Sequence, residues 1–297
     1  MQAVGLDIGG TKTLALRVDA EGRILAREVV STPADDVEGM LASAAAAVAA
    51  VTSDEVSAVG AGVAGMVGDG VVVFAPNLAW RNLQVAARIS AVTGLPCVAD
   101  NDANVAAWAE SRLGAARGKD HVLMLTVGTG IGAGIVSGGR LFHGSHGFAG
   151  EVGHIIVEPD GPLCGCGNRG CWETVASGRA IDRLSRSAFG DGAPSGTGIT
   201  ELAREGDAAA LGVLEEVGRR LGEGIAGLVN VLDPEIVVIG GGVVEAGELL
   251  LEPTRRHFLA SLEASEFRPE VPILPAALGP EAGAIGAALL ALSEAQS

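Results

Sequence analysis

The 297-residue sequence has no tyrosine, only 3% aromatic residues, and no long hydrophobic run. Its longest nearly apolar stretch, Leu41 to Val51, has 11 residues, whereas a membrane-spanning helix needs roughly 20. We therefore expect a soluble chain with no membrane partner. Disorder throughout the chain is excluded as well, because 48% of the residues are hydrophobic and only 19% are charged. The length suggests two domains, at about 150 residues each.

Positive charge is also scarce. Lysine and arginine together number 20 against 36 acidic residues, which gives a formal net charge of −16. A surface with this bias repels a phosphate backbone, so nucleic acid is not an expected partner. Lys12 and Lys119 are the only lysines in the sequence. An anionic ligand would therefore be held mainly by backbone amides, by arginine or by a bound cation.

No secretory leader is recognisable at the N-terminus, where Met1 is followed directly by a strand-like segment. We therefore expect a cytoplasmic protein. Four cysteines are present, and three of them lie between Cys164 and Cys171. In a reducing compartment, such a cluster is more often a metal site than a disulfide framework.

Glycine, by contrast, is abundant, with 45 residues. In each half of the sequence an apolar strand runs into a glycine-rich turn and a second strand follows; the turns are Gly9 to Thr11 and Gly128 to Gly132. A third glycine run, Gly240 to Gly242, follows another buried type of strand. The pattern predicts an α/β protein with two similar lobes and a crossing at Gly114 to Gly118. The expected strands are 2–8, 13–18, 23–30, 56–63, 96–99, 121–127, 133–136 and 235–239, and the expected helices are 37–51, 83–92, 103–113, 207–232 and 283–292.

A glycine-rich turn between two strands can point successive backbone N–H groups at one phosphate oxygen without any lysine. Two such turns, one in each lobe, predict a site that holds a polyphosphate from both sides, although either turn alone is better explained as a tight turn. The segment from Gly5 is not a P-loop, because Thr11 occupies the position of the required lysine. Gly128 to Ala133 fits a loosened dinucleotide-binding pattern, but a strand, not the required helix, is expected to follow it.

The clustered cysteines are spaced like metal ligands. Cys164, Cys166 and Cys171 are separated by glycines, and His154 lies ten residues before the first of them. Three thiolates and one imidazole complete a tetrahedral zinc shell with no open position, which is the structural type of zinc site. The remaining cysteine, Cys97, is expected to be an ordinary strand residue.

Several polar residues are candidates for acid–base chemistry. Asp102 lies at the end of a predicted strand and at the start of a predicted helix. It therefore projects into a ligand site at the carboxyl end of a sheet, or it only caps the helix, and the spacing favours neither interpretation. Glu151 and His154 are three residues apart and would share one face of a helical turn, and Glu173 follows the cysteine cluster closely. Zinc binding would hold these side chains on a fixed frame.

Together, these motifs resemble those of the bacterial sugar kinases of the ROK group, in the actin, Hsp70 and hexokinase superfamily. Within that group the sequence is most similar to actinobacterial ATP-dependent glucokinases. The resemblance covers nearly the whole chain, and the cysteine motif is its most specific part. The matching segments are Asp7 to Lys12, Asn101 to Asn104, Gly128 to Gly132, Glu151 to His154, Cys164 to Glu173 and Gly240 to Gly242.

The resemblance implies an α/β, two-lobe actin/Hsp70/hexokinase-like (ribonuclease H-like) fold with a cleft between the lobes. The small lobe would comprise residues 1–114, with the C-terminal helix at about 284–297 packed back on it. The large lobe would comprise residues 115–283. It further implies a homodimer or homotetramer that associates through the larger lobe.

The implied reaction is transfer of the γ-phosphate of ATP to the 6-hydroxyl of glucose, with Asp102 as the general base. The implied sugar ligands are Gly65, Asn77, Asn101, Asp102, Glu151, His154 and Glu173. The implied nucleotide-site residues are Asp7, Gly9, Gly10, Thr11, Lys12, Thr129, Gly130, Gly132, Gly240, Gly241 and Gly242, with Asp7 near a Mg²⁺ ion. The implied ligands of a structural Zn²⁺ are His154, Cys164, Cys166 and Cys171, so that His154 would contact both the metal and the sugar.

Other functions remain open at this stage. A kinase for N-acetylglucosamine or N-acetylmannosamine would use the same frame with a different space around the sugar 2-substituent. A non-catalytic sugar sensor of the same group is a third alternative, which an intact Asp102 disfavours. Repressors of the group carry a helix-turn-helix segment before the first glycine motif, whereas here only eight residues precede Gly9. A polyphosphate donor is disfavoured, because few cations lie near the motifs.

Overall fold

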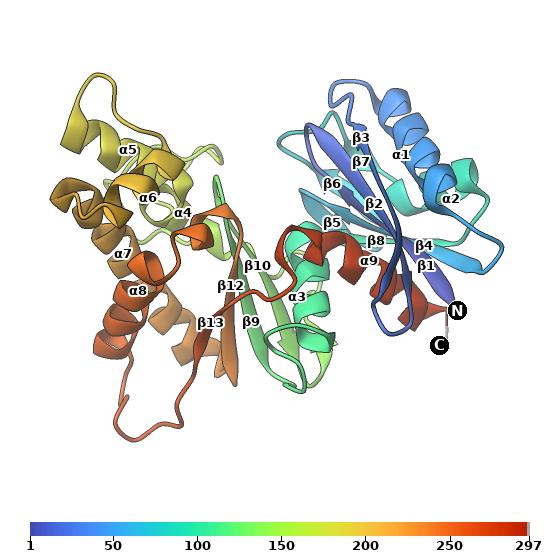
Figure 1. Ribbon diagram of the computed structural model, residues 1–297. Helices are drawn as coiled ribbons and strands as arrows, with labels where there is room; N and C mark the ends of the chain where they lie inside the picture. Colours follow the sequence, from blue (N-terminus) through green and yellow to red (C-terminus); the bar gives the residue numbers. More distant parts are fainter. Residues whose placement is uncertain (296–297) are drawn as a thin grey trace. The chain divides into compact units, whose positions relative to one another are not determined.

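The computed structural model describes residues 1–295 (Figure 1). The chain divides into two compact units. The first unit comprises residues 1–122, 134–150 and the C-terminal segment from Ala276, and the second comprises Leu123–Ala133 and Glu151–Pro275. This division differs from the expected lobes, 1–114 and 115–283, because residues 115–122, 134–150 and 276–283 group with the first unit. A single strand, β10 (Ile131–Ser137), continues across the division, which turn composition alone does not reveal.

A five-stranded sheet forms the centre of the first unit, in the order β3-β2-β1-β4-β8. The first three strands pair antiparallel, as a meander, and the last two continue the sheet in parallel to β1. Their bounds are β1 Gln2–Ile8, β2 Lys12–Asp19, β3 Ile24–Ser31, β4 Val56–Val63 and β8 Cys97–Asn101. All five expected strands of this region are therefore confirmed, and each observed end lies within two residues of the predicted end.

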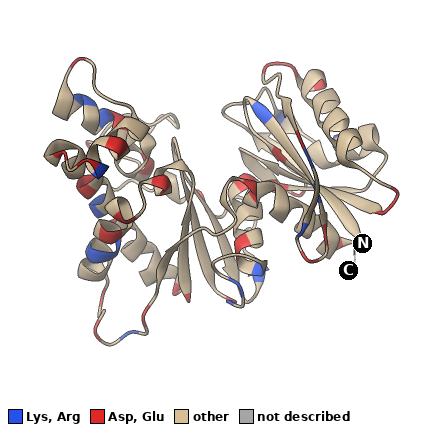
Figure 2. Ribbon diagram, viewed as in Figure 1, with Lys and Arg blue, Asp and Glu red and all other residues tan. Residues whose placement is uncertain are grey.

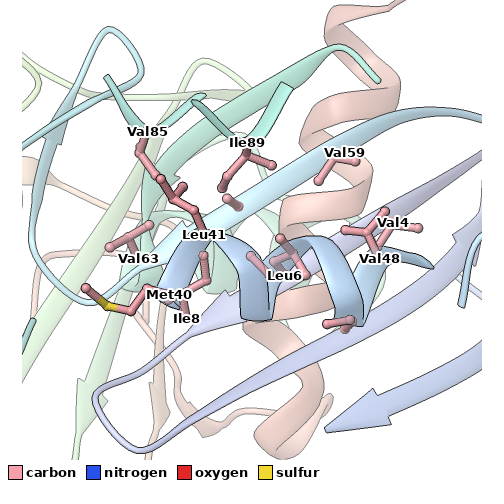
Figure 3. Close-up of a cluster of buried hydrophobic side chains, with 14 of the residues drawn as sticks. Val4, Leu6, Ile8, Met40, Leu41, Val48, Val59, Val63, Val85 and Ile89 are labelled. Carbon is pink, nitrogen blue, oxygen red and sulfur yellow. The ribbon is translucent and has the colours of Figure 1, made fainter. Parts of the chain in front are cut away.

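Helices cover both faces of this sheet. Helix α1 (Val37–Val51) buries Leu41 and Val48 against β1 and β4, in the cluster of side chains that Figure 3 shows. Helix α9 (Ala282–Glu294) packs against β1 and β4 from the other side. The backbones approach closely there, since a Cβ atom at Gly5 would lie 1.8 Å from the carbonyl oxygen of Ala284. Helix α3 (Asp102–Arg112) packs beside α9.

The sequence patterns did not predict a second, small sheet in the first unit. It consists of β5 (Met66–Gly68), β6 (Val71–Phe74) and β7 (Arg81–Leu83), all antiparallel, and is followed by α2 (Val85–Thr93). Each of these strands has only three or four residues, which is too short for a period of two to stand out.

The second five-stranded sheet has the order β11-β10-β9-β12-β13. Its strands are β9 Val122–Val127, β10 Ile131–Ser137, β11 Arg140–Leu141, β12 Ile236–Gly240 and β13 Ile273–Pro275. A strand, β10, follows the glycine turn at 128–130 directly, as expected. The dinucleotide-binding alternative is therefore excluded, because it requires a helix at this position.

The helices of the second unit are α4 to α8. The longest, α7, is capped at its start by the Asp207 side chain and ends at Asp233, which adopts a left-handed conformation (φ 46°) just before Pro234. It packs against α8 over much of its length. The bounds are α4 Trp172–Ala176, α5 Gly178–Phe189, α6 Gly196–Arg204, α7 Ala208–Leu232 and α8 Glu248–Ser261. Short 3₁₀ helices of this unit are η1 Val152–His154 and η2 Gly242–Ala246, and another, η3 Gly279–Glu281, belongs to the first unit.

Acidic side chains are spread over both units, and several arginines lie on the helices of the second unit (Figure 2). Arg219 on α7 pairs with Glu216 and Glu223, both at 2.6 Å, and Arg256 on α8 pairs with Glu215 at 2.8 Å. These cations are engaged in ion pairs on helix surfaces. None of the helices in residues 1–295 combines the length and the apolar character that crossing a bilayer requires.

Candidate active site

The end of strand β8 carries Asn101, a predicted sugar ligand, and the predicted general base Asp102 follows it directly. The Asn101 side chain caps α3, because its Oδ1 accepts hydrogen bonds from the N–H groups of Ala103 (2.8 Å) and Asn104 (3.2 Å). Its Nδ2 donates to the carbonyl oxygen of Gly65 at 2.9 Å, which brings two predicted sugar ligands together. The N-cap is therefore Asn101, and the alternative that Asp102 serves only as the cap is wrong.

Asp102 is instead the first residue of α3 and is half-buried. Its Oδ1 also accepts from the N–H of Ala103, at 2.9 Å. The carboxylate thus lies at the positive end of the helix dipole, which attracts negative charge. Asp102 therefore lies directly after strand β8, at the start of α3, and Asn101 already caps this helix.

Asp100 holds the start of α3 by hydrogen bonds to Asn101 and Asn104. It is only 5% exposed, and its Oδ1 accepts from the Asn101 N–H (2.7 Å) and from Asn104 Nδ2 (2.8 Å). Its other oxygen lies 2.6 Å from Nε2 of His143, and this hydrogen bond raises the pKa of His143. Sequence reasoning missed His143, because it lies 43 residues from Asp100 and belongs to no spacing pattern.

The first glycine turn, between β1 and β2, is closed by a hydrogen bond from the Gly9 N–H to the Lys12 carbonyl at 3.1 Å. Thr11 and Lys12 are exposed there. A Cβ atom at Gly10 would lie 3.1 Å from the carbonyl oxygen of Asn77, so the turn lies beside that predicted sugar ligand. Asp7, near the end of β1, is partly buried, and its desolvation raises its pKa, although the nearby Lys12 lowers it.

The predicted metal ligands of the second unit converge. One ligand atom from each of His154, Cys164, Cys166 and Cys171 lies within 4.8 Å of all the others. Cys164 Sγ is 3.7 Å from His154 Nδ1, and Cys166 Sγ is 3.6 Å from Cys171 Sγ. Zinc–sulfur bonds of about 2.3 Å in a tetrahedron place ligand atoms roughly 3.5 to 3.8 Å apart, so the cluster fits a closed four-ligand zinc site.

Three thiolates so close together would repel one another, so their deprotonated form requires a nearby positive charge. Burial raises the pKa of Cys164 and of Cys171, whereas a hydrogen bond from the Asn168 backbone lowers that of Cys166. A dication would offset this cost, because metal-bound cysteine is deprotonated. The donor set therefore fits Zn²⁺ both in geometry and in chemistry.

Two carboxylate side chains, Glu151 and Glu173, lie beside this cluster. His154 Nδ1 faces Cys164, and its Nε2 lies 3.9 Å from Glu151 Oε2 across the turn of η1. Desolvation raises the pKa of Glu151, His154 lowers it in part, and Glu173 has a smaller raising effect. Glu173 Oε1 accepts a hydrogen bond from the Cys164 thiol at 3.1 Å. The structure thus places Glu151, His154 and Glu173 together beside the cysteine cluster, as expected.

The second glycine turn lies next to this frame. A Cβ atom at Gly130 would lie 2.4 Å from Glu173 Oε2, so only glycine fits at this position without moving the carboxylate. The turn itself is closed by a hydrogen bond from Gly128 N–H to the Gly130 carbonyl at 3.0 Å, with Thr129 exposed at its tip. Gly132 lies beyond the turn, within β10.

The third glycine run also adjoins this turn. Gly241 has a positive φ of 89°, and a Cβ atom there would lie 2.4 Å from the carbonyl oxygen of Val127, at the end of β9. Gly240 ends β12, and Gly242 begins η2. The predicted site residues of each unit therefore gather among themselves. Those of the first unit are Asp7, Gly9, Gly10, Thr11, Lys12, Gly65, Asn77, Asn101 and Asp102, and the others belong to the second.

Comparison with known protein families, sequences and structures shows to which family this chain belongs. The sequence profile of the ROK family matches residues 3–294. The chain is 41% identical to a glucokinase of Streptomyces coelicolor, over 97% of this chain and 96% of the relative, and 37% identical to an N-acetylmannosamine kinase of Escherichia coli, over 99% of each. It also superposes on the crystal structure of a ROK family glucokinase of Streptomyces griseus in complex with glucose and AMPPNP, with a TM-score of 0.88, 44% identity and coverage of 99% and 100%. The predicted actin- and hexokinase-like α/β fold class is confirmed, and the chain belongs to the ROK family.

Proposed function

We propose that this protein is an ATP-dependent glucokinase, which transfers the γ-phosphoryl group of ATP to the 6-hydroxyl of glucose. The observation that carries the proposal is the position of Asp102, a carboxylate fixed at the start of α3 beside Asn101, whose side chain binds Gly65. Glucokinases of Streptomyces, at 41% and 44% identity over nearly the whole chain, support it.

Asp102 acts as the general base in this proposal. It accepts the proton of the sugar 6-hydroxyl as that oxygen attacks the γ-phosphorus in line, and the P–O bond to ADP breaks. Because the transition state of phosphoryl transfer is loose, catalysis consists mainly of positioning and charge stabilisation. The sugar is held by Gly65, Asn77, Asn101, Glu151, His154 and Glu173.

The nucleotide is held by backbone amides of the glycine turns. The turns at Gly9–Lys12 and Thr129–Gly132 hold the phosphates, and the run Gly240–Gly242 holds the adenosine. Asp7 is the carboxylate that accompanies Mg²⁺, which neutralises phosphate charge when bound. A partly buried carboxyl group with a raised pKa suits this role, because a cation beside it favours its ionised form.

Zinc has a structural role in this proposal. His154, Cys164, Cys166 and Cys171 hold it, and the metal supplies no catalytic step because all four of its positions are filled by protein ligands. His154 thus uses Nδ1 for the metal, and its Nε2 is directed to the side of Glu151, where a sugar hydroxyl binds. Reduced, metal-bound cysteines are typical of the cytoplasm, which is where we place the reaction.

A panel of sugars with MgATP, coupled to ADP release, tests the proposal. We expect glucose to be phosphorylated with the highest kcat/KM. The similarity to an N-acetylmannosamine kinase favours a second candidate substrate class, so N-acetylmannosamine and N-acetylglucosamine belong in the panel. A higher kcat/KM for either would replace glucose as the substrate, and sugar binding without ADP release would identify a sensor. Replacing ATP with polyphosphate tests the donor, and light scattering tests whether the protein is a homodimer or homotetramer.

A further inference from the structure

The second glycine turn is held by two residues that the sequence patterns did not single out. Ser177 is 0% exposed, and its Oγ donates a hydrogen bond to the carbonyl oxygen of Thr129 at 2.9 Å. The N–H of Gly178 donates to the carbonyl oxygen of Gly128 at 2.8 Å. Ser177 lies between α4 and α5 at the N-cap position of α5, yet its side chain makes no capping bond to that helix. Its hydroxyl bonds to the turn instead.

The junction between α4 and α5 lies tightly against the second glycine turn and near the residue that follows the third glycine run. A Cβ atom at Gly178 would lie 2.8 Å from the carbonyl oxygen of Gly128 and 3.7 Å from Cγ2 of Val243. Val243 follows the Gly240–Gly242 run directly. Residues 177–178 therefore contact the second glycine turn by hydrogen bonds and lie near Val243.

The other end of α4 is anchored at the cysteine cluster. Cys171 immediately precedes α4, and its carbonyl oxygen accepts from the N–H (2.8 Å) and the hydroxyl (2.7 Å) of Thr174. The next residue, Trp172, is 1% exposed, and its Nε1 donates to the Arg220 carbonyl at 2.8 Å. These bonds fix the five-residue helix at its start, so Ser177 at its end occupies a defined position.

The two carbonyl bonds also determine where the amides of the turn point. A peptide unit is planar and trans, so its N–H points away from its own carbonyl oxygen. Holding the Gly128 carbonyl fixes the direction of the Thr129 N–H, and holding the Thr129 carbonyl fixes that of the Gly130 N–H. Both amides are thereby directed away from the α4–α5 junction.

From this geometry we propose that Ser177 is a positioning residue for the nucleotide phosphates. Through the Thr129 carbonyl, its hydroxyl orients the Gly130 amide before the nucleotide binds, beside the Thr129 amide that the Gly178 N–H orients. Less order therefore has to be created on binding. The identity of the ligand rests on the proposed kinase function. The hydroxyl of Ser177 contacts the turn and not the ligand, so its removal weakens nucleotide binding without altering the sugar side of the site.

The test compares Ser177→Ala with Ser185→Ala. Ser185 is also 0% exposed, lies on α5, and donates to a backbone carbonyl, that of Pro194, at 2.7 Å. Each variant therefore loses one buried hydrogen bond of the same kind. Calorimetry with MgADP and steady-state kinetics with MgATP and glucose give the affinities and both KM values. If Ser177→Ala does not fold, Ser177→Cys, which is close in size and a weak donor, takes its place.

We expect Ser177→Ala to weaken MgADP binding and raise KM for MgATP about 3- to 10-fold, as loss of one hydrogen bond implies. The KM for glucose should change less than about twofold, and Ser185→Ala should leave both nucleotide values near wild type. An unchanged MgADP affinity in Ser177→Ala, or an equal loss in Ser185→Ala, overturns the inference. A wild-type protein that binds MgADP but phosphorylates no sugar refutes the kinase proposal alone, and one that binds no nucleotide refutes both.

Discussion

His143 lies with its Nε2 atom 2.6 Å from Oδ2 of Asp100, the buried carboxylate that also holds the backbone of Asn101. The imidazole is partly exposed, with 42% of its side-chain surface accessible, whereas the aspartate side chain is 6% accessible. A histidine whose pKa is raised by this hydrogen bond thus supports the segment that carries the proposed general base.

This pair predicts a pH-dependent stability. The hydrogen bond to Asp100 raises the pKa of His143 above its ordinary value of 6.5, so the protonated imidazole stabilises the folded state. That contribution is complete below pH 6.5 and is lost as the pH rises through the raised pKa. Urea unfolding of wild type and His143→Gln between pH 5.5 and 8.5 should show a steeper loss of unfolding free energy in the wild type. Parallel curves would contradict the assignment, and the exposed His146, replaced by Gln, serves as the control.

Replacing the general base should separate catalysis from stability. Asp102→Asn should lower kcat for glucose about 10²- to 10⁴-fold, which is the usual contribution of general base catalysis. The melting temperature should change little, because Asn101 still caps α3. In contrast, Asn101→Ala removes that cap and should reduce the unfolding free energy by about 0.5 to 2 kcal/mol. Turnover by Asp102→Asn at the wild-type rate would remove Asp102 from the mechanism.

Metal analysis of the purified protein should give about one zinc per chain, since the four ligand atoms form a single closed site. Cys166→Ser should reduce bound zinc to less than about half of this and lower the melting temperature, because structural zinc contributes folding free energy. Cys97→Ser should keep its zinc, since Cys97 lies on β8 in the other unit. Equal zinc contents in the two variants would show that the cysteine cluster is not the metal site.

Gly130→Ala should impair the site through a steric contact. The added methyl group would lie 2.4 Å from Glu173 Oε2, so the carboxylate has to move away from its position beside Cys164. We expect kcat/KM for glucose to fall about tenfold or more, as small displacements of positioning groups cost 10- to 100-fold. The control is Gly227→Ala on α7, where a Cβ atom meets nothing within 4 Å. It should keep wild-type activity, and comparable losses in both variants would argue against the contact.

The core of the first unit gives a prediction for stability alone. Leu41, on α1, is 1% exposed and lies in the cluster of Figure 3. Leu41→Ala should reduce the unfolding free energy by about 2 to 5 kcal/mol, because it leaves a cavity against the sheet. Val92→Ala, at a site 46% exposed on α2, should change it by less than about 0.5 kcal/mol. Denaturant titration of the two variants measures the difference.

Hydrophobic periodicity predicted the elements that have long, regular patterns. The bounds of α1 and β4 agree with the sequence interpretation residue for residue, and α7 ends where Asp233 and Pro234 stop it. The short strands β5 to β7 were missed because three or four residues carry no clear period. Helix α8 contains Pro253, which reads as a helix breaker in a sequence, although the helix continues through it.

The site shows the same limit. The cysteine cluster was predictable, because its ligands lie close together in the sequence and glycines separate them. The capping role of Asn101 was not, since aspartate and asparagine are equally good N-caps and lie side by side at 101 and 102. His143 and Ser177 act through contacts with residues 43 and 48 positions away, which no local pattern encodes.

The packing of α9 on β1 and β4 has a consequence for synthesis of the protein on the ribosome. Strand β4 ends at Val63, but the helix that covers it begins only at Ala282, about 220 residues later. Before α9 has been synthesised, it cannot cover its face of the first sheet. This face includes the surface around Gly5, where the α9 backbone packs closely. The first unit therefore cannot complete the packing of its sheet until α9 has been synthesised.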